Sequence, residues 1–204
     1  ASTNSLSLKD QPVVRISWDQ AARFCNWLSA KEGLPAAYQE SNGVMVPVTP
    51  MTIGYRLPSE AEWAYAARYG GGSQSARKYP WGEQMPPPGA AGNFAGTESS
   101  GEGERGLSNY TDEFPVSAPV ARDGSSALGL YDLGGNVHEW IHDYYLISSS
   151  GLGKSPLAPL GAAEGNNHVI RGSSWRSGSS TELRLAWRDQ GSGGKDDIGF
   201  RVAR

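Results

Sequence analysis

The sequence has only one cysteine, Cys25, among its 204 residues. A single cysteine excludes an internal disulfide and any metal or redox site that needs two thiolates from this chain. Cys25 falls on the apolar side of a predicted helix, and no cationic neighbour is evident that would activate a thiolate. We therefore interpret Cys25 as a small buried hydrophobic residue.

Charge of one sign and long apolar runs are also scarce. The chain carries 18 Lys and Arg against 21 Asp and Glu, a net charge of −3, and has no long basic run. It therefore lacks the electrostatic footprint of a nucleic-acid-binding protein. No apolar run approaches the roughly 20 residues that span a bilayer.

The opening residues, ASTNSLSLKDQ, lack the charged and apolar regions of a signal peptide. We expect such a peptide to be absent or already removed. The sequence does not fix the compartment. We expect a bacterial protein that is periplasmic or secreted rather than cytoplasmic.

Glycine, proline and aromatic residues are plentiful, with 27 Gly, 13 Pro, seven Trp and nine Tyr. The glycine and proline content is typical of a loop-rich protein, whereas the aromatic residues argue against disorder. We predict one compact, irregular domain that follows a flexible segment at residues 1–11.

Two helices are predicted from their start signals. Ser17 with Gln20, and Ser59 with Glu62, have the spacing of the capping box, in which the first side chain bonds a backbone N–H and the second reaches back. The first helix is expected to end at Gly33. The second is expected to end in the glycine run at residues 70–72.

The strand signals are short. Residues 38–48 suggest a hairpin that turns at Asn42-Gly43, because both residues tolerate the positive φ of a tight turn. Further strands are predicted at residues 13–16, 168–175, 183–187 and 198–202. Residues 73–129 have little periodicity, and a loop of this length is usually functional or held in place by other contacts.

The stretch at residues 129–143, GLYDLGGNVHEWIHD, contains more His, Asp and Glu side chains, which could bind a metal or take part in catalysis, than any separate stretch of this length. One interpretation is the H-E-x-x-H zinc motif formed by His138, Glu139 and His142 on a helix. The other is a metal-binding turn that leads into a buried strand. No third zinc ligand stands out and the pattern is short, so we keep a zinc hydrolase only as a minor alternative.

Seven motifs occur in one order: RLPSEAEW at 56–63, YPWG at 79–82, GN at 92–93, APV at 118–120, the stretch 129–140, RGSSW at 171–175 and GFR at 199–201. This order resembles the formylglycine-generating enzyme family, also called the sulfatase-modifying-factor domain, over residues 12–204. The resemblance implies one α+β domain with a C-type-lectin-like fold, rich in loops and with few regular helices and strands. The segment that usually precedes the first helix in this family is not visible.

The resemblance also implies two calcium sites. The family's ligand positions in the first match Asp132, Gly135, Val137 and Glu139, with the glycine and the valine acting through their carbonyls. Those in the second match Asn93, Phe94, Asp112 and Phe114. Calcium takes six to eight oxygen ligands, which carboxylates and loop carbonyls supply. We therefore expect calcium as the bound ion.

The family's enzymes oxidise a substrate cysteine with copper that two cysteines hold. The matching positions here are Ser177 and, approximately, Ser180. Serine hydroxyls are poor ligands for soft Cu(I), so we expect neither copper nor formylglycine generation.

The favoured hypothesis is a calcium-stabilised, non-catalytic module that binds a peptide, protein, glycan or small ligand through the 175–188 region. The candidate ligand-binding residues are Trp175, Arg176, Ser177, Ser180, Arg184 and Arg188. This segment also resembles the variable proteins of diversity-generating retroelements, which suggests a variable display protein. The alternative is an oxidase of the same fold that works without the copper-binding cysteines.

Partners are expected to be such a ligand and further domains of a longer protein, with no nucleic acid and no membrane span. Arg171, Arg184, Arg188 and Arg201 lie on or near the last predicted strands. Either they converge on one site or they form salt bridges with the many carboxylates.

Overall fold

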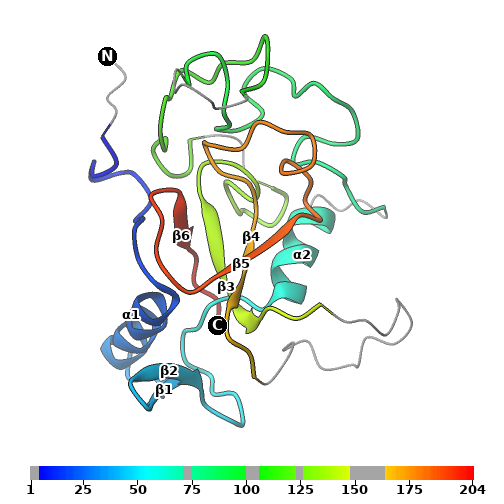
Figure 1. The fold of residues 1–204 in the computed structure, drawn as a ribbon. Helices are drawn as coiled ribbons and strands as arrows, with labels where there is room; N and C mark the ends of the chain where they lie inside the picture. The colour runs from blue at the N-terminus through cyan, green and yellow to red at the C-terminus, as the bar shows by residue number, and fades with distance from the viewer. Residues whose placement is uncertain (1–4, 71–74, 100–105, 123–125, 148–163) are drawn as a thin grey trace.

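The computed structural model describes residues 5–70, 75–99, 106–122, 126–147 and 164–204. Two helices flank a central sheet, a hairpin lies at one end and the long loops gather at the other (Figure 1). The elements in order are α1 (Trp18–Lys31), β1 (Tyr38–Ser41), β2 (Val44–Pro47), α2 (Glu60–Tyr69), β3 (His138–Tyr144), β4 (His168–Arg171), β5 (Arg188–Gly191) and β6 (Ile198–Phe200).

Both helices begin where the sequence predicted. The Ser17 side chain accepts a hydrogen bond from the Gln20 N–H, and the Gln20 side chain accepts one from the Ser17 N–H. Ser59 and Glu62 repeat this arrangement at α2. Each capping box satisfies two backbone donors that the helix itself leaves unpaired, so both start signals are confirmed.

The predicted strands are confirmed only in part. The hairpin turns at Asn42-Gly43, where φ is +52° and +83°. Residues 198–202 contain β6, and β4 ends before Gly172, whose φ of +76° turns the chain out of the strand.

Two predicted strands are wrong. Residues 13–16 form no strand, because Arg15 has a φ of +61° that breaks the extended backbone. Residues 183–187 form successive turns, closed by local hydrogen bonds such as that from the Trp187 N–H to the Arg184 carbonyl at 2.9 Å. The strand starts only at Arg188.

The main sheet has the order β5-β4-β3-β6. Strands β5, β4 and β3 are antiparallel neighbours, while β6 runs parallel to β3. β3 therefore lies between two strands, and its residues are buried from Glu139 to Asp143. The prediction of a buried strand after the glycine turn is confirmed.

Strand alternation sends apolar side chains to both faces of this sheet. Trp140 and Ile170 belong to the cluster that packs against α1, whereas Ile141 and Val169 belong to the cluster around Trp63 of α2. Successive side chains of a strand point to opposite faces, so β3 and β4 each contribute to two cores. Each helix covers one face, which makes a helix–sheet–helix arrangement (Figure 1).

A third cluster holds the loops together. Tyr79, Phe94, Tyr110 and Leu183 are all buried, and each comes from a different loop. The start of the chain joins this half of the molecule as well, because the Gln11 side chain donates to the Ser117 carbonyl. Among the residues that the structure describes, no helix is long and apolar enough to cross a membrane.

Asp143, at the end of β3, connects the sheet to α2. Its Oδ2 accepts a hydrogen bond from the Glu60 N–H at 2.8 Å, at the first turn of the helix. The carboxyl is only 4% exposed, and this burial raises the pKa of Asp143 to about 6. Nearby Glu60 and Glu62 add to the rise, because their negative charges disfavour a second one.

This shift predicts a pH dependence of stability. The folded protein keeps the Asp143 proton up to about pH 6, whereas the unfolded chain loses it near pH ~4. The contribution of Asp143 to the free energy of unfolding therefore falls as the pH rises from about 4 to 6. Asp143→Asn has no such proton and still offers an oxygen to the Glu60 N–H. The difference in free energy of unfolding, Asp143→Asn minus the original chain, should therefore increase by about 2 kcal/mol as the pH rises through this interval.

Urea unfolding of both proteins at several pH values between 4 and 7 measures this difference. His142 and His168 have pKa values lowered to about 4 by burial and affect stability in the opposite direction. Because both proteins contain these histidines, their effect cancels in the difference. A difference that stays flat from pH 4 to 6 would contradict the assignment.

Candidate functional site

The turn before β3 depends on a run of left-handed backbone conformations. Asp132, Gly134, Gly135 and Asn136 have φ values of +53°, +114°, +135° and +67°. A Cβ on Gly134 would lie 2.7 Å from Cγ of Pro80, too close for any side chain. The two glycines are therefore required both by the backbone and by the close approach of the neighbouring loop.

Asn136 ties this turn to three other loops. Its side chain accepts from the Ala118 N–H at 2.9 Å and donates to the Ala118 carbonyl at 3.2 Å. Its backbone N–H donates to the Asn93 carbonyl, and its carbonyl accepts from the Trp175 N–H, both at 2.9 Å. Asn136 is 3% exposed, so these bonds form in the interior, where an unpaired polar group is costly.

The first predicted calcium set comes together at one cavity of about 300 Å³. The residues of the set that line it are Asp132, Gly135, Val137 and Glu139. Tyr131, Phe200 and Arg201 complete much of its wall. The sequence thus identified residues that the fold gathers, although Arg201 was not assigned to this position.

Arg201 changes the chemistry available to Glu139. Its Nη2 and Nε donate to the two carboxylate oxygens of Glu139, and the Nε contact measures 2.7 Å. Trp63 Nε1 donates to the same carboxylate at 2.6 Å. Glu139 is therefore neutralised and hydrogen-bonded within the protein, so a cation at this cavity would compete with Arg201.

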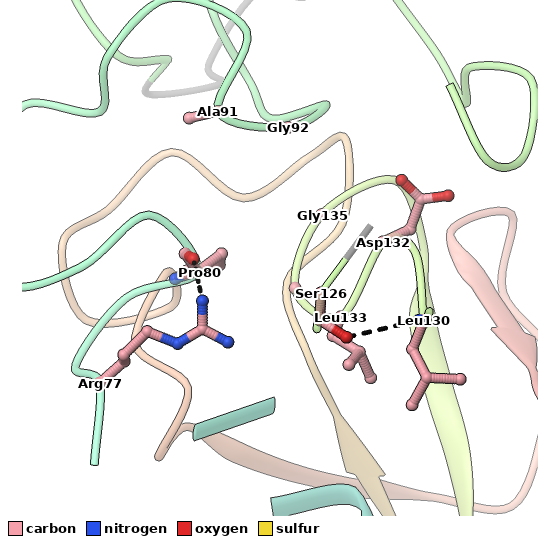
Figure 2. A pocket seen from close by; sticks show the side chains of 10 residues that line it. Arg77, Pro80, Ala91, Gly92, Ser126, Leu130, Asp132, Leu133 and Gly135 are labelled. Carbon is pink, nitrogen blue, oxygen red and sulfur yellow. Dashed lines mark hydrogen bonds between the residues drawn. The ribbon is translucent and has the colours of Figure 1, made fainter. Parts of the chain in front are cut away.

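A smaller cavity of about 120 Å³ lies on the other side of the turn. Figure 2 shows Arg77 across this space from Asp132, with the Arg77 guanidinium donating to the Pro80 carbonyl at 3.2 Å. Ser126 borders the space as well and accepts from the Leu130 N–H. Asp132 lines both cavities, and its Oδ2 accepts a hydrogen bond from the Ala121 N–H at 3.2 Å.

The second predicted calcium set contains both hydrogen-bonded oxygens and an oxygen that has no partner among the described residues. Asp112 accepts from the Phe94 N–H at 2.8 Å and from the Phe114 N–H at 2.9 Å, which places all three residues at one point. Asn93 is 2% exposed, and its Oδ1 accepts no hydrogen bond from any described residue. A buried amide oxygen without a donor is suited to a cation.

Glu98 is a residue of this region that the sequence reasoning missed. Its Oε1 accepts from the Gly96 N–H at 3.1 Å, while its buried Oε2 has no partner in the described part of the chain. Burial raises the pKa of Asp112 to about 6, and the charge of Glu98 contributes to the rise. The only sequence signal was one carboxylate in a Gly/Ser/Glu-rich loop, which any solvent-exposed loop would also show.

The H-E-x-x-H residues lie on a strand. Four residues of strand separate His138 from His142 by about 13 Å, whereas the zinc motif needs both on adjacent turns of a helix. His138 Nδ1 contacts the Gly172 carbonyl at 2.7 Å, and His142 Nδ1 contacts the Tyr38 hydroxyl at 3.0 Å. Within the described ranges, no three His, Cys, Asp or Glu side chains gather at metal-binding distance.

The predicted ligand-binding residues divide into buried and exposed groups. Trp175 and Ser177 are buried, and the Ser177 Oγ accepts from the Ser174 N–H at 3.1 Å. Arg176, Ser180 and Arg184 are exposed. The Arg176 guanidinium lies over the Trp175 ring at 4.5 Å and donates to Asp196.

The four arginines do not converge on one site. Arg171 and Arg188 both contact Glu60 at the start of α2, at 3.2 Å and about 2.5 Å, while Arg201 pairs with Glu139. Arg184 remains on the surface apart from them. For three of the four, the salt-bridge alternative is confirmed.

Comparison with known proteins gives a consistent picture. A family model described as the sulfatase-modifying factor enzyme 1-like domain matches residues 2–204. The serine/threonine-protein kinase Pkn1 of Chlamydia trachomatis is 33% identical over 198 residues, which cover 95% of this chain and 24% of the kinase. The formylglycine-generating enzyme of Bos taurus is 29% identical over 204 residues, covering 95% of this chain and 44% of the enzyme.

Solved structures have the same fold. Treponema denticola variable protein 1 superposes with a TM-score of 0.70 at 26% identity, over 99% of this chain and 74% of that protein. PvdO from Pseudomonas aeruginosa gives a TM-score of 0.63 at 26% identity, over 95% and 61%. The predicted α+β fold class is confirmed. The chain spans less than half of the length of the kinase and of the bovine enzyme.

The contact between Glu139 and Arg201 predicts a large loss of stability when the carboxylate is removed. Glu139→Gln leaves the Arg201 guanidinium without its counter-charge at a site where the Glu139 side chain is 6% exposed. Breaking one partner of a buried pair costs about 3 kcal/mol. Urea unfolding should report a decrease of this size in the free energy of unfolding.

Glu40→Gln is the matched control, because Glu40 pairs with Arg23 at a site where both side chains are about half exposed. Its effect should stay below about 1 kcal/mol. Equal effects of the two substitutions would show that the Glu139 pair contributes no more than a surface pair.

Proposed function

The chain belongs to the family of sulfatase-modifying factor enzyme 1-like domains, and from this premise we propose that it is a non-catalytic, calcium-stabilised binding module. Its ligand is a peptide, protein, glycan or small molecule, bound through the exposed side chains of the 175–188 region. The observation that carries the proposal is the chemistry of residues 177 and 180, where serine hydroxyls stand in the segment expected to hold copper. A variable display protein is one form of this function.

The thiol content supports the absence of copper chemistry. Cys25 is the only cysteine and lies in α1 with no exposed surface. Burial raises the pKa of its thiol to about 12, so it remains protonated at neutral pH. Ser177 supports the backbone of its own turn through the Ser174 N–H. A neutral hydroxyl already used in this way is a poor ligand for Cu(I).

The outer surface of the same segment suits recognition. Arg176, Ser180 and Arg184 are exposed, and the Arg176 guanidinium also donates to Asp196. Arginine can donate several hydrogen bonds at once to carboxylates or carbonyls, which favours acidic or polar ligands. The likeness to Treponema denticola variable protein 1 supports a display role.

The calcium part of the proposal rests most strongly on the Asn93 and Asp112 region. Asn93 Oδ1 and Glu98 Oε2, which have no partner in the described part of the chain, are buried oxygens near a carboxyl whose pKa burial has raised. A divalent cation would accept these oxygens as ligands and favour the charged form of Asp112. The carbonyls of Phe94 and Phe114 would complete the expected set, and the ion would hold the surrounding loops together.

The set around Asp132 supports calcium less strongly. Asp132, Gly135 and Val137 share its cavity, but Glu139 already has Arg201 and Trp63 as donors. A calcium ion there would have to displace a bidentate guanidinium or rely on Asp132 and carbonyls alone. We therefore expect the Asn93 and Asp112 region to be the higher-affinity site.

Calcium should raise the thermal stability of the protein. An ion that binds only the folded state adds about 2.7 kcal/mol when its concentration is one hundred times the dissociation constant. Thermal unfolding with calcium, compared with unfolding in a chelator, should therefore show a higher Tm. Glu98→Gln should weaken calcium binding about tenfold, because it removes a charged oxygen ligand.

Glu113→Gln is the matched control, since Glu113 is an exposed carboxylate beside Asp112. It should keep the full calcium effect. An unchanged Tm on chelation would contradict the calcium proposal. If calcium raised the Tm of Glu98→Gln as much as that of the original chain, only the role of Glu98 would be excluded.

The absence of the thiolates predicts the outcome of an oxidation assay. With copper, oxygen and a cysteine-containing sulfatase-type peptide, the protein should yield no aldehyde, because no thiolate pair holds Cu(I). Mass spectrometry of the peptide measures the product. Formation of the aldehyde would overturn the non-catalytic proposal, and the bovine formylglycine-generating enzyme is the positive control.

A binding experiment tests the recognition surface separately. An acidic peptide should bind the original chain and bind an Arg176→Ala, Arg184→Ala double variant at least tenfold more weakly, because two cationic hydrogen-bond donors are lost. Arg23→Ala, which removes an exposed arginine of α1, is the control. Equal affinities for all three proteins would argue against the 175–188 surface.

A further inference from the structure

A third cavity, of about 270 Å³, lies at the opposite end of the sheet from the long loops. It is bordered by the first turn of α1, by β2 of the hairpin and by the ends of β3 and β4 that face them. Trp18, Asp19, Met45, Tyr144 and His168 line it. None of these residues belongs to the calcium sets or to the 175–188 surface.

Stacked rings make one wall of this cavity rigid. The rings of Trp18 and His168 are parallel within 6°, with centroids 3.6 Å apart. Tyr144 covers the other side of His168, with centroids 4.2 Å apart. Trp18 Nε1 also donates to the Ile141 carbonyl at 2.8 Å, which fixes the stack against β3. A wall held in this way is formed before any ligand arrives.

The polar groups of the cavity give it negative charge. Asp19 Oδ1 accepts from the Met45 N–H at 2.9 Å, and Oδ2 has no partner among the described residues. Burial lowers the pKa of His168 to about 4, so its imidazole is neutral at pH 7. Among the residues that the structure describes, no lysine or arginine lines the cavity.

The negative charge of Asp19 also acts on Tyr144. Burial raises the pKa of its hydroxyl, and the negative charges of Asp19 and Glu164 raise it further. Of these two carboxylates, Asp19 lines the cavity, and Tyr144 stays protonated at neutral pH. A site with this field attracts cations and repels anions.

We propose that this cavity binds a protonated primary amine carried on a short alkyl chain. The ammonium group donates to the Asp19 carboxylate, and the alkyl chain packs on Met45 and on the ring edges of Trp18 and Tyr144. The bond is charge-assisted and lies in a partly enclosed space, so it is stronger than the same contact on an open surface.

Other ligand classes fit this chemistry less well. A carboxylate or phosphate would face Asp19, and the described lining residues include no cation that would offset the repulsion. An alcohol of the same length would gain the apolar contact but not the ionic one. A divalent metal ion needs more oxygen ligands than the one lining carboxylate provides.

The test compares three probes of equal chain length: n-butylammonium, 1-butanol and butyrate. Titration calorimetry at pH 7 and low salt should give at least tenfold tighter binding for n-butylammonium than for 1-butanol, and no binding of butyrate. Raising the salt concentration should weaken only the ammonium complex. Equal binding of n-butylammonium and 1-butanol would overturn the proposal.

Asp19→Asn should lower the affinity for n-butylammonium at least tenfold, and its amide oxygen can still accept from the Met45 N–H. Asp10→Asn is the matched control, since Asp10 is an exposed carboxylate outside this cavity. An unchanged affinity in a folded Asp19→Asn protein would overturn the assignment of Asp19. If this variant does not fold, the comparison of the three probes on the original chain still decides the question.

Discussion

The loop-rich half of this protein depends on the hydrogen bonds of one buried residue, Asn136, which uses both its side chain and its backbone. Three loops, which contain Asn93, Ala118 and Trp175, bring backbone polar groups into the interior, where each must find a partner. Asn136 supplies donors and acceptors to all of them from one position in the turn before β3. The left-handed run through Gly135 delivers it there. The described residues of this region form almost no strands or helices, and the backbone and side chain of Asn136 together take the place of a regular hydrogen-bond ladder.

Local signals in the sequence predicted local structure well. The capping boxes and the Asn42-Gly43 turn succeed because each involves residues at most three positions apart. The strand expected at residues 183–187 failed because its apolar residues are equally suited to turns that bury a side chain. Leu185 is held instead by a bond from its N–H to the distant Lys78 carbonyl at 2.9 Å. Such a contact leaves no mark in the local pattern.

In the candidate site too, the sequence predicted contacts between residues close in the chain and did not predict contacts between distant ones. Asp132, Gly135 and Glu139 lie within one short turn and the start of its strand, so any fold that keeps the turn keeps them together. The pairing of Glu139 with Arg201 joins residues 62 positions apart and depends on β6 lying parallel to β3. Which carboxylate an arginine selects is decided by tertiary packing, so the alternatives for the arginine set stayed open until the fold was known.

In residues 175–188, backbone contacts hold the segment in place while exposed side chains form its surface. The same fold can therefore present different surface side chains. Backbone contacts hold this segment in place, including those from the Trp175 N–H to Asn136 and from the Ala95 N–H to the Ser177 carbonyl. These bonds do not depend on side-chain identity. The exposed side chains of Ser180 and Arg184 contribute little packing, so replacing them costs little stability. A surface of this kind can change its chemistry while the sheet, the helices and the Asn136 contacts stay the same, which is the physical requirement for a display protein.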